Sequence, residues 1–408
     1  AGCYEAGTAP FGFDLTQYLR FGEKNLLAVA TDNTSTRNIP FCIAETPAQE
    51  SSQPGTYLLE QDGSIPEGYH HGVGYFWNCN DFNPTIGGIS RPVHLYLKPK
   101  MYLTLPLYSN LQTKGSYLYA ADFDWSRKTA VITAEAEIRN ETDQPKEAWI
   151  EVTVRGHRGE TAAVFSSEKR VIAPVGEQTS AKTLVPEDAY IWDEASQQYV
   201  PQAEDQVLPT QTESMHTEIL CAQSAQVPLD FWSIDHPYLY QAEISLMTED
   251  GCIDREVIET GFTEIGYDKD RGVLLNQKAV WLRGYAQRAA NEWAAIGIAP
   301  EWLKDEDAAL IRESNANHIR FMHVAASPAD IRSFDRNGIV CTQPAGDKER
   351  ENFGRQWDQR VELMRDIIIA FRNHPSIVFW EAGNNSIGKE HMREMRLLKE
   401  ALDPKRGR

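Results

Sequence analysis

Long apolar runs and a surplus of basic side chains are both absent from this sequence of 408 residues. No stretch approaches the ~20 apolar residues that a membrane-crossing helix needs, so no membrane partner is expected. Lysine and arginine total 40 against 59 aspartate and glutamate residues, and the formal net charge is −19. Because contacts with nucleic-acid phosphates require a basic face, no nucleic-acid partner is expected either. The balance of 41% hydrophobic and 24% charged residues is typical of a globular protein.

Cysteine is scarce and scattered along the chain. The six cysteines lie at positions 3, 42, 79, 221, 252 and 341, without a CxxC pair. This spacing indicates neither a disulfide lattice nor a zinc knuckle, and buried free thiols are the expected state. The first five residues, A-G-C-Y-E, contain neither a basic segment nor an apolar core, so no signal peptide is expected within this chain. The compartment stays open, and a periplasmic or secreted location is compatible with the sequence.

The first two thirds of the chain predict β structure. A chain of this length exceeds one ordinary hydrophobic core, so two or three domains are expected. Residues 91–97 alternate between apolar and polar side chains, as a half-buried strand does. Residues 131–138 alternate in the same way and end at the turn-rich segment 139–143. We expect 148–154 to be their hairpin partner in a β-sandwich that begins near Pro99.

From Leu274 the pattern changes to alternating strands and helices. Ser327 and Asp330 form a capping-box pattern, and Asn337-Gly338 is a stop signal. The predicted strands are 280–283, 317–321, 339–342 and 377–380, and the predicted helices are 300–315, 327–337, 357–371 and 389–402. Four β–α repeats therefore fall within 135 residues, whereas a complete eight-stranded barrel takes ~250. The alternatives are an open parallel sheet and the first half of a barrel, and sequence motifs favour the second.

Several motifs follow one another in a characteristic order. Residues 10–16 read P-F-G-F-D-L-T and are followed at 22–29 by G-E-K-N-L-L-A-V. Residues 87–95 read G-G-I-S-R-P-V-H-L, and residues 275–284 read L-N-Q-K-A-V-W-L-R-G. Further on, N-H-I-R ends at Arg320 and N-H-P-S-I begins at Asn373. In this order the motifs resemble those of glycoside hydrolase family 2, which contains β-galactosidases, β-glucuronidases and β-mannosidases.

The resemblance implies a multidomain β plus α/β fold. A jelly-roll sugar-binding domain, incomplete at its N-terminus, would occupy residues 1–98, and an immunoglobulin-like β-sandwich would occupy 99–265. The first four β/α units of a (β/α)8 TIM barrel would occupy 266–408. The chain thus resembles a family member truncated at both ends, with the family's nucleophilic Glu expected beyond Arg408. The resemblance implies no cofactor, and the sequence shows no metal-ligand cluster. Because family members often form oligomers, a homo-oligomer is compatible with the resemblance.

The expected acid position departs from the family pattern. The family's fourth barrel strand reads W-x-x-G-N-E, in which the Glu donates a proton, whereas this chain has Trp380, Gly383, Asn384 and Asn385. An amide releases no proton at any useful pH, so Asn385 cannot be a general acid. Three explanations stay open: a relocated acid, assistance by the substrate, and a protein that binds sugar without cleaving it. The resemblance gives Asn384 a hydrogen bond to the sugar 2-hydroxyl.

Two glutamates are candidates for a relocated acid. Glu381 lies four residues before Asn385, and its alternative role is a buried carboxylate paired with a barrel arginine such as Arg320 or Arg283. Glu292 lies in the loop after the first barrel strand, on the face where such barrels perform chemistry. Its alternative role is a solvated loop acid.

The resemblance supplies the remaining substrate-binding candidates. Arg320 and His323 stand at the end of the second barrel strand, where family members place an arginine near the nucleophile and a histidine that faces the sugar. The alternative for each is an interior hydrogen-bonding role. Asp81, in the polar and aromatic segment 77–83, corresponds to a jelly-roll residue that reaches the sugar in some galactosidases, and its alternative is a plain polar turn. Trp380 completes the substrate-binding set.

The sequence therefore predicts a retaining β-glycosidase, β-galactosidase-like, that cleaves a terminal β-linked sugar with an atypical acid. The 408 residues alone are expected to be inactive, because retaining hydrolysis needs two carboxyl groups about 5–5.5 Å apart and the chain supplies at most one of them. The alternative is a non-catalytic carbohydrate-binding protein on a degenerate hydrolase fold. A third interpretation is an open α/β domain attached to two β modules.

Overall fold

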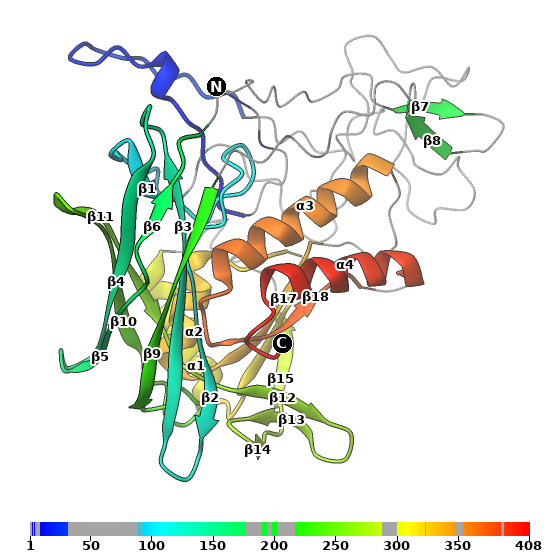
Figure 1. Ribbon diagram of the computed structural model, residues 1–408. Coiled ribbons are helices and arrows are strands. Elements are labelled where there is room, and N and C mark those ends of the chain that lie inside the picture. Colours follow the sequence, from blue (N-terminus) through cyan, green and yellow to red (C-terminus); the bar gives the residue numbers. More distant parts are fainter. Residues whose placement is uncertain are drawn as a thin grey trace.

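The computed structural model describes residues 2, 4, 9–31, 89, 91–175, 190–193, 198–201, 217–287, 300–322, 324–346, 354–384 and 387–408. Antiparallel strands make up one part of the molecule, and a parallel sheet flanked by helices makes up the other (Figure 1). The segment predicted as a first domain contributes one short 3-10 helix, η1 (Thr16–Tyr18), to the described residues. A separate strand pair consists of β7 (Tyr190–Asp193) and β8 (Gln198–Pro201).

Two antiparallel sheets make up the β part. The first has the order β1-β3-β2, with β9 also paired to β3. Its strands are β1 (Met101–Leu103), β2 (Tyr117–Asp124), β3 (Thr129–Asn140) and β9 (Thr217–Pro228). The second has the order β11-β10-β4-β5, with β6 also paired to β4. Its strands are β4 (Lys146–Gly156), β5 (Thr161–Ser166), β6 (Arg170–Ile172), β10 (Tyr240–Thr248) and β11 (Gly251–Thr260).

Alternating side chains pack the two sheets against one core. Ile132 and Ala134 of β3 share this core with Ile150 and Val152 of β4, and all four are fully buried. The expected hairpin between 131–138 and 148–154 is wrong, because β3 and β4 belong to different sheets. Strands that face each other across a core have the same alternation as strands that are hydrogen-bonded side by side. The pattern alone therefore could not separate the two arrangements.

A small antiparallel sheet leads into the parallel sheet. It consists of β12 (Ile265–Asp268), β13 (Gly272–Leu275) and β14 (Lys278–Ala279). The parallel sheet follows in the order β15-β16-β17-β18, with strands β15 (Gly284–Gln287), β16 (His318–Phe321), β17 (Val340–Pro344) and β18 (Ile377–Glu381). The first barrel strand was thus predicted four residues too early, at 280–283. The strand begins instead at Gly284, which pairs with His318, whose carbonyl oxygen would lie 1.7 Å from a β-carbon at position 284.

Four helices accompany this sheet within the described residues, and the ends of α2 and α4 follow the sequence signals. They are α1 (Glu301–Glu313), α2 (Pro328–Asn337), α3 (Gly354–Phe371) and α4 (Lys389–Leu402). Ser327 and Asp330 form the predicted capping box of α2, and Gly338 ends that helix in the left-handed conformation with φ 65°. Pro300 is the N-cap residue of α1 rather than its first helical residue. The last predicted helix agrees with α4 at both ends.

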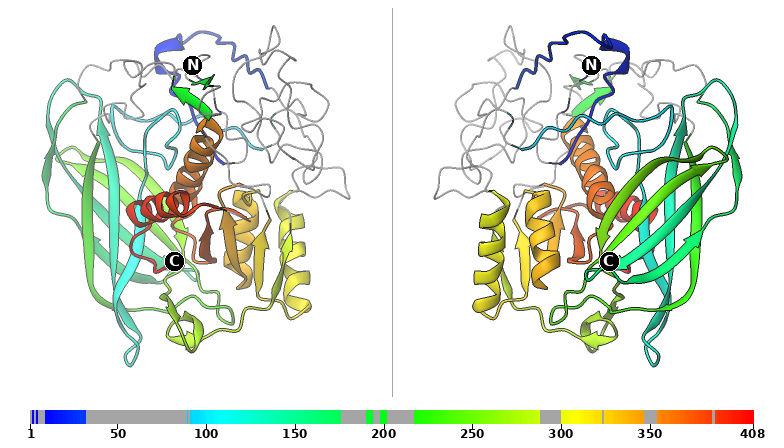
Figure 2. Two further views of the ribbon diagram at one scale, coloured as in Figure 1. Left: turned by 90° about the vertical axis from the view of Figure 1, so that its right-hand side faces the viewer. Right: turned by 90° about the vertical axis from the view of Figure 1, so that its left-hand side faces the viewer.

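The helices pack on one face of the parallel sheet, which we call its outer face. Ile319 of β16, Cys341 of β17 and Ile377 of β18 share a hydrophobic cluster there with side chains of α1, α2 and α3. On the opposite, inner face, Val340 and Val378 pack with residues from the β12–β13 sheet and with Trp232. Two views from opposite sides, each at a right angle to Figure 1, show the helical part lying against the antiparallel strands (Figure 2). Within the described residues, the structure contains no helix with the length and apolar character needed to span a membrane.

Candidate functional site

The carboxyl ends of the parallel strands bring together three side chains that the sequence singled out. Arg320 lies near the end of β16, Glu381 ends β18, and Asn384 follows three residues later. Since parallel strands end at the same edge of a sheet, Arg320 becomes a neighbour of Glu381, 61 positions later in the sequence, and of Asn384, 64 positions later. Register places Arg320 opposite Thr342 of β17, and Thr342 opposite Phe379 of β18.

Arg320 and Glu381 form a two-pronged ion pair. The Arg320 Nε–H donates to Glu381 Oε2 over 2.6 Å, and the Nη2 group donates to Oε1. The same Nη2 also donates to the side-chain oxygen of Asn384 at 3.0 Å. The Arg320 side chain is 30% exposed and that of Glu381 is 16% exposed, so the pair is partly shielded from water. Fork-like contacts between guanidinium and carboxylate are stronger and more directional than single ion pairs.

A shift of register in β18 decides which side chains face this site. Cys341 lies opposite Ile377, but the next residue, Thr342, lies opposite Phe379, so Val378 is an extra residue in β18. Ile377 faces the helices, and in a regular strand Phe379 and Glu381 would share that outer face. The extra residue turns Phe379 and Glu381 to the inner face instead. The contact between Glu381 and Arg320 therefore depends on this bulge.

Below the ion pair, the inner face is lined by aromatic and polar groups. His318 contacts the Thr342 hydroxyl through Nε2 at 3.0 Å, and burial lowers the pKa of the His318 imidazole. The Phe379 ring packs 5.5 Å from the ring of Tyr267. The Tyr267 hydroxyl donates to the carbonyl oxygen of Val378 at 2.6 Å. A neutral imidazole and two aromatic rings thus form an uncharged floor beneath the Arg320–Glu381 pair.

The other predicted site residues either lie away from this site or fall outside the described residues. Trp380 is not brought together with Arg320 and Asn384, because it lies on the outer face, where its indole N–H donates to Asp403 at 2.9 Å. Arg283, the other arginine considered for Glu381, instead donates to the backbone oxygen of Asn315. The four remaining candidates lie outside the described residues: Asn385, Glu292, His323 and Asp81. Sequence reasoning missed His318, Tyr267 and Asp403, for which no local pattern signals a contact with β17 or β18.

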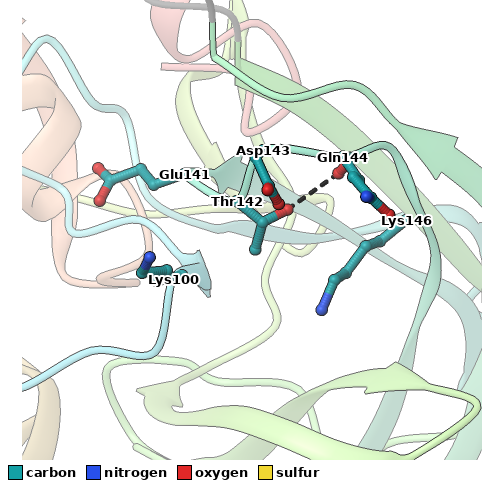
Figure 3. A pocket seen from close by; sticks show the side chains of 6 residues that line it. All are labelled: Lys100, Glu141, Thr142, Asp143, Gln144 and Lys146. Atoms are coloured by element: carbon teal, nitrogen blue, oxygen red, sulfur yellow. Dashed lines mark hydrogen bonds between the residues drawn. The ribbon is translucent and has the colours of Figure 1, made fainter.

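A hollow lies in the β-sandwich rather than at this site. It has a volume of about 550 Å³ and is lined by the side chains of Lys100, Glu141, Thr142, Asp143, Gln144 and Lys146 (Figure 3). Glu141 already accepts a hydrogen bond from the Tyr102 hydroxyl at 2.8 Å. All six residues belong to the sandwich, so the hollow is separate from the ends of β16 and β18. In the part of the chain that the structure describes, no three His, Cys, Asp or Glu side chains converge as a metal site.

Comparison with known proteins finds a protein-family match for the α/β part of the chain. Residues 268–407 match the family model described as "Glycosyl hydrolases family 2, TIM barrel domain". This match begins at the last residue of β12 and includes all four parallel strands and all four helices.

Similarity to individual proteins extends over nearly the whole chain. A β-glucuronidase of Formosa agariphila is 31% identical over 402 residues, which cover 98% of this chain and 34% of that protein. A β-galactosidase of Bacteroides ovatus, BoGH2A, is 22% identical and is covered to 34% of its length. A solved β-glucuronidase from glycoside hydrolase family 2 superposes with a TM-score of 0.73 at 29% identity, covering 99% of this chain and 35% of that one. The chain thus spans about a third of the length of the relatives it matches.

Proposed function

Because the chain belongs to glycoside hydrolase family 2, we propose that it forms part of an enzyme that cleaves a terminal β-linked sugar with retention of configuration. Arg320, Glu381 and Asn384 would line the sugar site at the carboxyl ends of β16 and β18. The observation that carries this proposal is their convergence at the edge of the sheet where barrel enzymes perform chemistry. We further propose that the domains follow the boundaries 1–98, 99–265 and 266–408, with jelly-roll, immunoglobulin-like and half-barrel folds.

A β-glucuronide is the first substrate to test. The relative with the higher identity and nearly complete coverage of this chain carries the name β-glucuronidase, whereas the β-galactosidase relative is only 22% identical. The galactoside that the sequence favoured is therefore the second substrate to test. Comparing turnover of nitrophenyl β-glucuronide with that of nitrophenyl β-galactoside decides between them.

The contacts of Glu381 argue against a role as the proton donor. Both of its oxygens accept hydrogens from the Arg320 guanidinium. A carboxylate held in this way carries no proton to donate while the fork persists. We infer that Glu381 holds Arg320 in place and that the acid lies elsewhere, with Glu292 as the remaining candidate from the sequence. Arg320 would in turn hold the Asn384 amide with its oxygen turned inward, because that oxygen accepts from Nη2.

The acid assignment is tested by pH profiles in an enzyme that carries these residues in a complete barrel. For Glu292→Gln we expect kcat/KM to fall at least ~100-fold and the alkaline limb of its pH profile to disappear, because that limb reports the acid. Glu381→Gln should lower kcat/KM while both limbs remain. The assignment fails if Glu292→Gln keeps wild-type turnover or if Glu381→Gln alone removes the limb.

The second candidate function is sugar binding without cleavage, which the amide at position 385 favours. A binder would retain affinity for the sugar and show no turnover even within a complete barrel.

We propose that residues 1–408 alone hydrolyse no nitrophenyl glycoside, since Glu381 is the one carboxyl group within the described part of the site and retention requires two. Measurable release of nitrophenol by this chain would contradict that proposal.

A further inference from the structure

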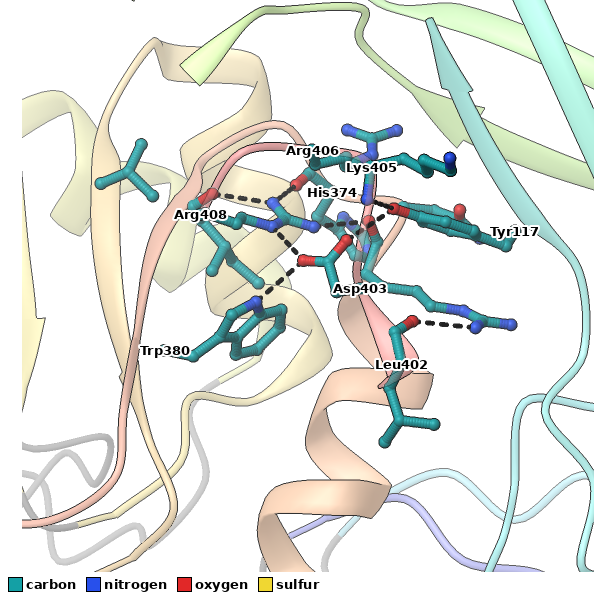
Figure 4. Close-up of polar contacts among 12 residues, drawn as sticks. Tyr117, His374, Trp380, Leu402, Asp403, Lys405, Arg406 and Arg408 are labelled. Carbon is teal, nitrogen blue, oxygen red and sulfur yellow. Dashed lines mark hydrogen bonds and ion pairs between the residues drawn. The ribbon is translucent and has the colours of Figure 1, made fainter. Parts of the chain in front are cut away.

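The outer face of β18 rests on a buried polar network that the proposed chemistry does not use. Asp403 directly follows α4, and its side chain and that of Arg408 are both fully buried. Asp403 Oδ2 accepts from the Trp380 indole N–H at 2.9 Å and from Arg408 Nε at 2.6 Å (Figure 4). Asp403 Oδ1 accepts from the Tyr117 hydroxyl at 2.8 Å. One carboxylate therefore joins β18, the segment after α4 and strand β2 of the sandwich.

Arg408 contacts β18 at two residues, Ile377 and Trp380. Its Nη1 donates to the carbonyl oxygen of Ile377 at 2.7 Å, directly before the extra residue Val378. Its guanidinium also lies over the Trp380 ring, 5.2 Å from the ring centre. On the inner face, the Tyr267 hydroxyl binds the Val378 carbonyl. The Ile377 carbonyl directly precedes the bulge and the Val378 carbonyl belongs to it, so the side chains of Arg408 and Tyr267 supply hydrogen-bond donors to the backbone there.

The surroundings of Asp403 favour its ionised form. Burial by itself raises the pKa of Asp403, but the Arg408 charge and the hydrogen bonds from Arg408, Trp380 and Tyr117 outweigh it and lower the pKa. Asp403 is therefore an anion enclosed by donors. A buried ion pair adds little net stability, because desolvation of the two charges offsets their attraction. Removing one partner is nevertheless costly, because it leaves an uncompensated buried charge.

We propose that Asp403 and Arg408 are positioning residues for the site: from the outer face they hold Trp380 and the Val378 bulge, and thereby aim Glu381 at Arg320 on the inner face. Tyr117 ties the sandwich to the same carboxylate. The positioning stands on these contacts alone, whereas its value for sugar cleavage rests on the proposed function.

Nuclear magnetic resonance of the 408-residue chain tests the positioning without any substrate. The reporter on the inner face is the Arg320 Nε–H, which is bonded to Glu381 and is assigned by its loss in Arg320→Lys. The reporter on the outer face is the Trp380 indole N–H, which is assigned by its loss in Trp380→Phe. In Arg408→Lys and Asp403→Asn, the Arg320 Nε–H should exchange with solvent about five-fold faster or more, because its hydrogen bond opens more often. The Trp380 indole resonance should shift in the same variants.

Two further variants separate positioning from general loss of stability. Ile150→Val shortens a fully buried sandwich side chain away from the network and should leave the Arg320 exchange rate unchanged. Tyr117→Phe removes only the hydroxyl that binds Asp403, so it provides a mild variant that is expected to fold. It should shift the Trp380 indole resonance and raise the Arg320 Nε–H exchange rate by a smaller factor than Arg408→Lys does. Tyr119→Phe is its matched control, since the Tyr119 hydroxyl binds Glu135 instead.

The proposal is overturned if folded Arg408→Lys and Tyr117→Phe leave the Arg320 exchange rate at the parent value, or if Ile150→Val raises it equally. Neither result depends on turnover, so a failure of the positioning is distinguishable from a failure of the proposed function. In an enzyme with a complete barrel, Arg408→Lys should lower kcat more than it raises KM, and a pure effect on stability would change neither in the folded fraction.

Discussion

The ion pair between Arg320 and Glu381 is the residue-scale feature on which the site depends. Glu381→Gln keeps the shape of the side chain but removes the charge that faces the guanidinium. We expect a loss of about 1–2 kcal/mol in the free energy of unfolding, kept small because the Arg320 side chain is 30% exposed. Urea unfolding measures the change. Glu400→Gln, in an exposed pair with Arg396, is the control and should change stability by less than about 0.5 kcal/mol. Equal effects in the two variants would contradict a special role for Glu381.

A second residue-scale prediction concerns pH. Burial raises the pKa of Glu256 from 4.5 to about 7, opposed by the Ser116 hydrogen bond and by Lys98, while Asp254 adds to the rise. The folded chain therefore holds this proton more tightly than the unfolded chain. The resulting stability is fully present below pH 4.5 and is lost as the pH rises through about 7.

Glu256→Gln removes this pH-dependent contribution. Relative to the parent, the variant should gain about 2–3 kcal/mol in unfolding free energy between pH 4.5 and pH 8. Urea unfolding at the two pH values measures the difference. Glu259→Gln, at an exposed position of the same strand β11, should run parallel to the parent. A Glu256→Gln curve that also runs parallel to the parent would show that the carboxyl is not titrating in this window.

At the scale of elements, helix ends were predictable because their signals are local. The Ser327–Asp330 capping box and the Gly338 stop lie within one turn of the backbone that they cap. Sheet membership was not predictable in the same way. The alternation in β3 and β4 fixes which side chains are buried, but the partner strands β9 and β10 lie about 90 residues away in sequence.

The bulge in β18 was likewise not predictable from local sequence, although it lies within the site. The resemblance singled out Arg320 and Asn384, and Glu381 was a candidate for a relocated acid. A regular strand through Ile377 would have turned Glu381 towards the helices. The carbonyl partners that satisfy the bulge come from Tyr267 and Arg408, which are distant in sequence. The face on which Trp380 lies therefore depends on contacts between residues that are far apart in sequence, and no local sequence pattern predicts those contacts.

An element-scale prediction concerns the turn after α2. Gly338 has φ 65°, and a β-carbon there would lie 2.1 Å from the backbone oxygen of Ile234. Gly338→Ala should therefore lower the unfolding free energy by at least about 3 kcal/mol, from left-handed strain and from the clash together. Gly159 has φ 86° with nothing within 4 Å, so Gly159→Ala should lose only the strain, about 1–2 kcal/mol. Equal losses in thermal or urea unfolding would show that the Ile234 backbone yields to the added methyl group.

At the scale of the whole molecule, a buried arginine joins the sandwich to the α/β part. Arg406 donates to Leu118 O at 2.7 Å and to the Thr260 hydroxyl at 2.9 Å, and burial lowers its pKa to about 10. Asn373, at the start of the N-H-P-S motif, also bonds the backbone of β2 through Leu118. The two parts therefore meet through buried polar contacts and are expected to unfold together.

Arg406→Ala should separate the two parts. Removing the side chain leaves buried acceptors without donors, so we expect a loss of about 3 kcal/mol or more and a second transition in calorimetry. Arg396→Ala, on the exposed face of α4, should preserve a single transition. A single, unshifted transition in Arg406→Ala would contradict the coupling between the sandwich and the parallel sheet.

The central claim concerns sugar cleavage at the carboxyl ends of β16 and β18, and turnover of Asn384→Ala tests it most directly. In an enzyme that carries these residues within a complete barrel, kcat/KM for nitrophenyl β-glucuronide or β-galactoside should fall at least ~100-fold, because contacts that strengthen in the transition state are lost. The unfolding free energy should change by less than about 1 kcal/mol. Wild-type kcat/KM in a folded Asn384→Ala enzyme would contradict the account.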